Sequence, residues 1–187
     1  VLTESIEALK NESQHMKELV EQLLFLARGD SGRNTLNKVK LDLNQMVSEV
    51  WEESQMIDEK HRYLFRGTDP AYMTGDIAMI KQSIRIFVQN AAKYSSDGAD
   101  ITLGVMLESG YVSYMIQDEG IGMESSDVVH IFERFYRSDE ARNSETGGSG
   151  LGLSIAKWIV DAHSGTIQVV SRPEIGTRFI VRFPMCE

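Results

Sequence analysis

The 187-residue sequence has little cysteine, little proline and no long apolar run. Its one cysteine, Cys186, makes no internal disulfide and no cysteine-based metal site, so the chain fits a reducing compartment. Three prolines and the lack of biased tracts argue against disorder. With no run of about 18 apolar residues and no signal-peptide pattern, we expect no membrane-spanning segment here. Because Val1 already lies in a helical pattern, we expect a fragment of a longer protein.

Positive charge is also scarce, since the formal net charge is −9. An acidic chain repels a phosphate backbone, which argues against nucleic acid as a partner. A nucleotide remains possible, because a few local cations and backbone N–H groups suffice to bind one. The content of 42% hydrophobic and 25% charged residues is typical of a soluble globular protein with one buried core.

A heptad pattern runs through residues 2–28. Its seam consists of Leu2, Ile6, Leu9, Ser13, Met16, Val20, Leu23 and Ala27. This spacing predicts a long helix, ended by Gly29–Gly32, that packs in a bundle with another helix or a second chain. The alternative is a helix that packs only on its own domain.

The rest of the chain alternates between helical and strand patterns after a polar linker at 33–39. Helices are predicted from Asp42, from Asp76 and over 151–162. Strands are predicted at 63–66, 101–107, 111–116, 167–170 and 178–183, with turns at Ser109–Gly110 and Gly176. This order indicates an α+β fold, a two-layer sandwich with one mixed, mostly antiparallel sheet and three main helices on one face.

A glycine-rich loop, Gly147-Gly-Ser-Gly-Leu-Gly-Leu153, directly precedes the third helix. Glycines and the free N–H groups of a helix start together favour a phosphate site, although a flexible connecting loop would look similar. The loop lacks the Lys-Ser or Lys-Thr of a Walker A motif and the third glycine of a dinucleotide motif. It therefore fits neither common nucleotide signature.

Three further segments carry candidate binding groups. Asp118-Glu-Gly-Ile-Gly122 follows a strand and offers a carboxylate to an exocyclic amine, or is merely an acidic turn. Asn90, Lys93 and Tyr94 share one helix face, where they suit Mg²⁺, a phosphate and a base, or simply face solvent. Ile131–Arg137 interleaves three aromatics with arginines, either as core packing or as the anchor of a ligand-covering loop at 138–149.

In this order and spacing, the four segments resemble the N, G1, F and G2 boxes of the sensor histidine kinase ATP-binding domain, a relative of DNA gyrase, Hsp90 and MutL. The resemblance covers about residues 37–187 and implies a Bergerat-type ATP-binding fold for residues 33–187. Residues 1–32 resemble the second helix of the family's dimerisation and histidine-phosphotransfer hairpin, truncated here.

The resemblance implies a role for each matching residue. Asn90 would coordinate Mg²⁺, Lys93 and Arg137 would contact phosphates together with Arg142, and Tyr94 would line the nucleotide. Asp118 would bind the adenine amine. The remaining expected ATP contacts are Gly120, Gly122, Gly148, Gly150, Leu151, Gly152 and Thr177.

Two features depart from the family pattern. None of His15, His61, His130 and His163 precedes an acidic residue, so the phosphoacceptor histidine is expected upstream and the fragment should not phosphorylate itself at the normal site. His163 matches a helix-end pattern that looks structural. Ile86 stands where many relatives have asparagine and the hydrolysing ones have a glutamate base; isoleucine takes no proton, which disfavours ATP hydrolysis.

The expected function is transfer of the ATP γ-phosphate to a histidine outside this chain, and then to a response-regulator aspartate. The expected setting is the cytoplasmic part of a homodimeric, membrane-anchored bacterial receptor. Two alternatives remain: an ATPase that acts as a conformational clamp, and a pseudokinase module that senses nucleotide without transfer.

Overall fold

The structure, a computed structural model, describes residues 2–138 and 148–186, and within the first helix not the side chains of residues 2–4, 8 and 11. The helices of these ranges are α1 (Leu2–Asp30), α2 (Leu43–Ile57), α3 (Ile77–Tyr94), α4 (Ser125–Val128) and α6 (Gly152–Ala162). The strands are β1 (Val39–Asp42), β2 (Arg62–Arg66), β3 (Tyr72–Gly75), β4 (Asp100–Glu108), β5 (Tyr111–Asp118), β6 (Thr166–Arg172) and β7 (Gly176–Pro184).

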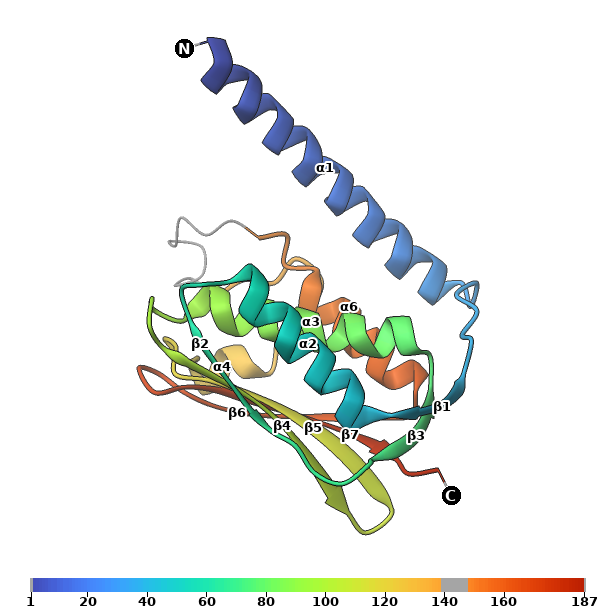
Figure 1. Cartoon of the computed structure of the whole chain (residues 1–187). Coiled ribbons are helices and arrows are strands. Elements are labelled where there is room, and N and C mark those ends of the chain that lie inside the picture. The colour runs from blue at the N-terminus through green and yellow to red at the C-terminus, as the bar shows by residue number, and fades with distance from the viewer. Residues whose placement is uncertain (1, 139–147, 187) are drawn as a thin grey trace.

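Five strands form one mixed sheet in the order β2-β4-β5-β7-β6. Strand β2 runs parallel to β4, and the other neighbouring pairs are antiparallel. Helices α2, α3 and α6 lie together on one face of this sheet (Figure 1). The predicted α+β sandwich is therefore confirmed. The structure adds a small antiparallel pair, β1 with β3, that the sequence patterns did not indicate.

The helices on the sheet begin where the sequence predicts. Asp42 caps α2 by accepting a hydrogen bond from the Asn44 N–H, and Asp76 caps α3 by accepting one from the Met79 N–H. Each cap satisfies an N–H group that the helix itself leaves free. The apolar side chains at helical spacing then face the sheet and are buried. In α2 they are Leu43, Met46, Val47 and Val50, and in α3 they are Ile80, Ile84, Phe87, Val88 and Ala91. Among the described residues, no helix combines the length and apolar character needed to cross a membrane.

Helix α1 extends from the body of the molecule, and Figure 1 shows its C-terminal half closest to α6. The predicted seam stays exposed, with Leu9 at 71% and Met16 at 59% of full exposure. A different stripe, Leu19, Phe25 and Leu26, packs on α6. One face of the helix therefore contacts its own domain, as the alternative had it, and the bundle with another helix or a second chain stays a prediction.

His163 joins two helices from the end of α6. It is 4% exposed, its Nδ1 lies 2.7 Å from the Ile159 carbonyl oxygen, and its Nε2 accepts a hydrogen bond from the Asp76 N–H at 2.9 Å. The ring must therefore be neutral, with its proton on Nδ1. Burial lowers the pKa of His163 below its ordinary value of 6.5.

This arrangement predicts a loss of stability in acid. Because the folded pKa lies below the unfolded one, the unfolded chain binds more protons as pH falls below 6.5. The free energy of unfolding should decrease by at most about 1.4 kcal/mol per pH unit from this group. Urea unfolding at pH 7.5 and 5.5 measures it. In His163→Gln, whose amide donates and accepts without titrating, this decrease should be smaller; an equal decrease in the variant and the parent would contradict the role of His163.

Candidate nucleotide site

A cavity of about 550 Å³ lies between α3, the start of α6, the end of β5 and α1. Ten of the residues expected at the nucleotide line it: Asn90, Lys93, Tyr94, Asp118, Gly122, Arg137, Gly148, Gly150, Gly152 and Thr177. They come from the four motif segments and, for Thr177, from a fifth segment at the start of β7. The fold therefore brings together what the four motifs predicted separately.

Asp118 sits at the end of β5, only 6% exposed. Its Oδ1 accepts hydrogen bonds from the Gly120 N–H at 2.9 Å and the Thr177 N–H at 3.1 Å. Burial raises the pKa of Asp118, and these two hydrogen bonds oppose that rise. Because both bonds use Oδ1, the second carboxylate oxygen is left to meet a donor such as an exocyclic amine in the cavity.

The glycines after Asp118 permit close backbone contacts rather than space for a ring. Gly122 has φ +68°, and a Cβ there would overlap the Arg172 carbonyl oxygen. A Cβ on Gly120 would overlap the Tyr94 carbonyl oxygen, which also accepts a hydrogen bond from the Ile121 N–H at 3.1 Å. These contacts fix the loop between the C-terminus of α3 and the β6–β7 turn, and so set the position of Asp118.

Two cations that are close enough to affect each other, Lys93 and Arg137, also line the cavity. Burial lowers the pKa of Lys93, and the nearby Arg137 guanidinium lowers it further. Lys93 Nζ also lies 5.1 Å from the centroid of the Tyr94 ring. A Cβ on Gly148 would fall on Lys93 Nζ, so glycine lets the loop approach the ammonium group. Like charges in a half-buried site favour an anion between them, and a phosphate supplies one.

The start of α6 also lines the cavity and offers backbone N–H groups to a ligand there. Leu151 caps this helix without a side-chain hydrogen bond, and the Leu151 N–H instead donates to Ser149 Oγ at 3.1 Å. Gly150 takes φ +69° and accepts a hydrogen bond from the Phe135 N–H at 3.0 Å. A helix start with little capping carries partial positive charge, which is the setting for a phosphate.

Asn90 and Ile86 lie one turn apart on the cavity side of α3. The Asn90 amide oxygen is a suitable ligand for Mg²⁺. Ile86 packs in both hydrophobic clusters, and a Cβ on Gly152 would lie 3.5 Å from its Cγ2. The position that is acidic in hydrolysing relatives is therefore apolar and part of the packing between α3 and α6.

Three of the expected contacts do not line the cavity. Gly120 contributes indirectly, because its N–H donates a hydrogen bond to Asp118, which does line the cavity. The side chain of Leu151 is fully buried with Leu26, Ile155 and Ile159, so only its backbone, the part expected to face the phosphates, could take part. Arg142 lies outside the described residues.

The cavity also has walls that the motifs did not indicate. Helix α3 adds Gln82, Arg85 and Gln89, which continue the helical spacing of Ile86 and Asn90 and could have been found from it. Helix α1 adds His15, Glu18, Leu19 and Gln22. The second set carried no usable signal, because the heptad pattern marks a different face of α1.

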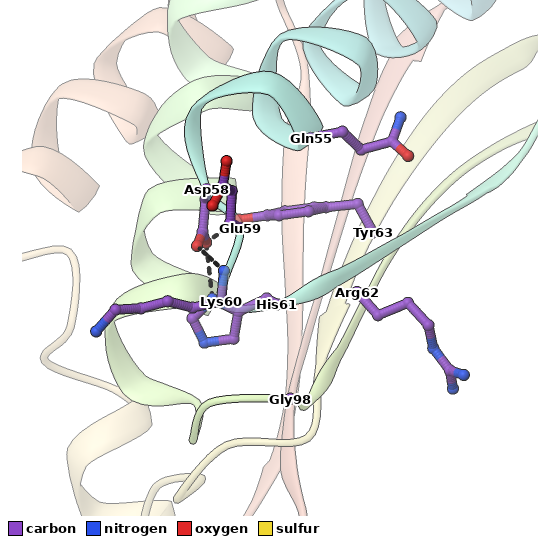
Figure 2. Close-up of a pocket in the computed structure, with 8 residues that line it drawn as sticks. All are labelled: Gln55, Asp58, Glu59, Lys60, His61, Arg62, Tyr63 and Gly98. Atoms are coloured by element: carbon purple, nitrogen blue, oxygen red, sulfur yellow. Dashed lines mark hydrogen bonds and ion pairs between the residues drawn. The ribbon is translucent and has the colours of Figure 1, made fainter.

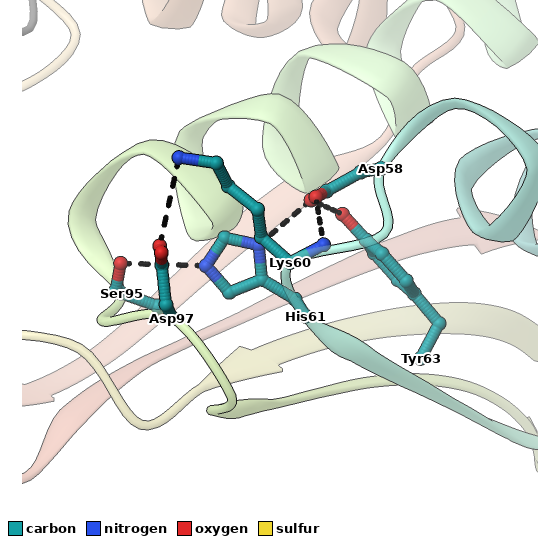
Figure 3. Close-up of polar contacts among 6 residues, drawn as sticks. All are labelled: Asp58, Lys60, His61, Tyr63, Ser95 and Asp97. Atoms are coloured by element: carbon teal, nitrogen blue, oxygen red, sulfur yellow. Dashed lines mark hydrogen bonds and ion pairs between the residues drawn. The ribbon is translucent and has the colours of Figure 1, made fainter.

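A second hollow, of about 420 Å³, lies where α2 ends and β2 begins (Figure 2). Asp58 Oδ2 lies 2.7 Å from both His61 Nδ1 and the Tyr63 hydroxyl (Figure 3). Burial would raise the pKa of Asp58, but hydrogen bonds from Tyr63, His61 and the Lys60 N–H lower it overall. His61 Nε2 lies 3.3 Å from the Ser95 carbonyl oxygen, at the end of α3. These groups hydrogen-bond to one another. Through the contact of His61 with Ser95 they hold the C-terminal end of α3, the helix that carries Asn90 and Lys93.

A mixed sheet under three helices, with a cavity lined by a buried aspartate, two cations and a glycine-rich helix start, fits an ATP-binding domain. Residues 75–187 match the family described as histidine kinase-, DNA gyrase B- and HSP90-like ATPase, so the chain belongs to that family.

The curated relatives are sensor kinases. The chain is 40% identical to the sensor histidine kinase YkoH of Bacillus subtilis over 98% of this chain and 40% of that protein. It is 34% identical to the signal transduction histidine-protein kinase ArlS of Staphylococcus epidermidis, over 99% and 41%. The chain thus spans less than half the length of these relatives. A solved structure of full-length ShkA in complex with AMPPNP superposes with a TM-score of 0.82 at 24% identity, over 95% of this chain and 37% of that one, which supports the fold.

Proposed function

We propose that this chain is the ATP-binding catalytic portion of a two-component sensor histidine kinase. In the reaction, the ATP γ-phosphate passes to a histidine that lies outside the chain, and then to an aspartate of a response regulator. Residues 33–187 form the ATP-binding domain, and residues 1–32 are the second helix of the dimerisation and phosphotransfer hairpin. The full protein is a homodimer whose kinase domains lie on the cytoplasmic side of a membrane.

The observation that carries the proposal is the opposed chemistry of the cavity. Asp118 offers a carboxylate oxygen to the cavity, and Lys93 and Arg137 add two positive charges to its lining. ATP carries groups that match both, an amine on its base and anionic phosphates.

Mg²⁺ would bind beside the phosphates, with the Asn90 amide oxygen as a ligand. No group of three or more His, Cys, Asp or Glu side chains forms a metal cluster within the part of the chain that the structure describes. An ion there would therefore draw its remaining oxygen ligands from the phosphates and water, as Mg²⁺ commonly does. When bound, the ion would neutralise charge on the transferring group.

The packing of Ile86 favours phosphotransfer over an ATPase clamp. Water attack needs a base near the γ-phosphate, and an isoleucine held between α3 and α6 takes no proton. Transfer to histidine needs no such base, because the neutral imidazole is itself the nucleophile. A pseudokinase with the same cavity would bind nucleotide and transfer nothing.

Titration of the chain with a non-hydrolysable ATP analogue, with and without Mg²⁺, tests the binding half of the proposal. We expect saturable binding at micromolar to millimolar analogue, stronger with Mg²⁺. Lys93→Ala should weaken it about tenfold or more, since a charge-assisted contact is lost. Lys157→Ala, which removes an exposed lysine of α6 paired with Asp161, is the matched control. Absence of binding at millimolar analogue would contradict the proposal.

A further inference from the structure

Helix α1 is fixed against the nucleotide domain by several contacts near its C-terminus. Leu26 is 2% exposed, and the Phe25 and Trp158 rings meet edge to face at 5.1 Å. Arg134 Nη2 donates to Asp30 Oδ1 at 2.7 Å. Burial of apolar area and an ion pair at the end of the helix hold α1 at a defined angle, so the side chains one or two turns earlier have fixed positions as well.

One of those side chains contacts the glycine-rich loop. Ser149 Oγ donates to Gln22 Oε1 at 2.9 Å. The same hydroxyl accepts the Leu151 N–H at 3.1 Å, so its proton points to Gln22 and its lone pair to the start of α6. Ser149 stands between Gly148, which lies against Lys93 Nζ, and Gly150, which takes a positive φ. Gln22 thus holds the centre of the loop expected to receive the phosphates.

Gln22 belongs to a row of α1 side chains on the cavity. His15, Glu18, Leu19 and Gln22 recur at spacings of three and four, which places them on one face of the helix. This face differs from the heptad seam, whose residues are exposed. One helix therefore offers its seam to a partner helix and a second face to the nucleotide cavity.

We propose that Gln22 is a positioning residue of the nucleotide site: through Ser149 it holds the glycine-rich loop in the conformation that binds phosphate, so α1 is a wall of the site. This inference rests on the proposed ATP site and extends it to a residue outside the ATP-binding domain. Docking of α1 and binding of nucleotide then reinforce each other. The coupling is reciprocal, since a contact that favours the bound loop is in turn favoured by the bound ligand.

A double-mutant cycle on the whole 187-residue chain tests the proposal. The variants are Gln22→Met, which keeps the length of the side chain and removes its polar atoms, Ser149→Ala, and both together. Each single change should weaken binding of the Mg²⁺ complex of a non-hydrolysable ATP analogue by about three- to tenfold, as for loss of one hydrogen bond. The double variant should bind as weakly as Ser149→Ala, because that single change already removes the contact with Gln22, together with the one from the Leu151 N–H.

Controls separate this contact from a general effect on folding. Lys17→Ala alters an exposed residue of α1, paired with Glu21, and should leave affinity unchanged. Thermal unfolding midpoints of all variants should stay within about 2 °C of the parent, because the contact is only partly buried. Parent-like affinity in Gln22→Met, or additive losses in the double variant, would overturn the role of Gln22 and leave the ATP site intact. Failure of the parent chain to bind would overturn both.

Discussion

Replacing Asp118 with asparagine should weaken ATP binding by about 100-fold or more, with little loss of stability. The amide oxygen of the new side chain can still accept the Gly120 and Thr177 N–H groups. Its NH₂ group would then face the cavity, where the carboxylate oxygen of the parent would meet the adenine amine. Two donors would oppose each other in a buried site, which leaves both unsatisfied. Calorimetric titration with an ATP analogue measures the affinity.

Asp100→Asn provides the matched control for this result. Asp100 begins β4, the strand beside β5, and pairs with Arg62 outside the cavity. Its replacement should leave affinity within a factor of about two, since this ion pair lies outside the cavity. Parent-like binding by Asp118→Asn would mean that this carboxylate does not recognise the base.

The second large effect is expected from Gly122→Ala. At φ +68° a side chain is strained, and the new Cβ would overlap the Arg172 carbonyl oxygen, which is backbone and cannot rotate away. The cost combines about 1–2 kcal/mol of backbone strain with displacement of the β6–β7 turn, about 3 kcal/mol or more in total. For a chain of this size, the thermal midpoint should fall by roughly 6–12 °C.

Gly110→Ala separates the two causes. Gly110 has a similar φ, +79°, at the β4–β5 turn, but nothing lies within 4 Å of an added Cβ. Its replacement should therefore show the strain alone, a fall of about 2–8 °C in midpoint. Equal midpoints for the two variants would mean that the contact of the Gly122 loop with the β6–β7 turn does not constrain the fold.

The main elements of the fold were predictable because their signals are local. Asp42 and Asp76 cap helices whose apolar residues recur every three or four positions, and Ser109–Gly110 turns the β4–β5 hairpin. Strands β1 and β3 were missed because each has only four residues, too few for a period of two to stand out from the neighbouring linker and helix patterns. Their pairing joins segments about 35 residues apart, which no local pattern reports.

The residues of the four motifs could be predicted to lie at the site, but the α1 side of the site could not. The motifs named Asp118, Lys93 and Arg137, and the structure places all three on one cavity. Leu151 was expected to offer its backbone to the phosphates, and its side chain packs with Leu26 of α1. The α1 wall could not be predicted, since nothing in the sequence of a helix tells which of its faces meets a loop more than about 100 residues away in the chain.

The most direct measurement is phosphoryl transfer from ATP to the histidine-bearing hairpin of the parent protein, supplied as a separate polypeptide. The chain should label that hairpin with acid-labile, alkali-stable phosphate, should carry none itself, and should release little inorganic phosphate when the hairpin is omitted. Asp118→Asn should abolish the labelling, and Lys157→Ala should retain it. Steady release of inorganic phosphate without the hairpin, or an unlabelled hairpin at saturating ATP, would contradict a kinase that transfers its phosphate to histidine.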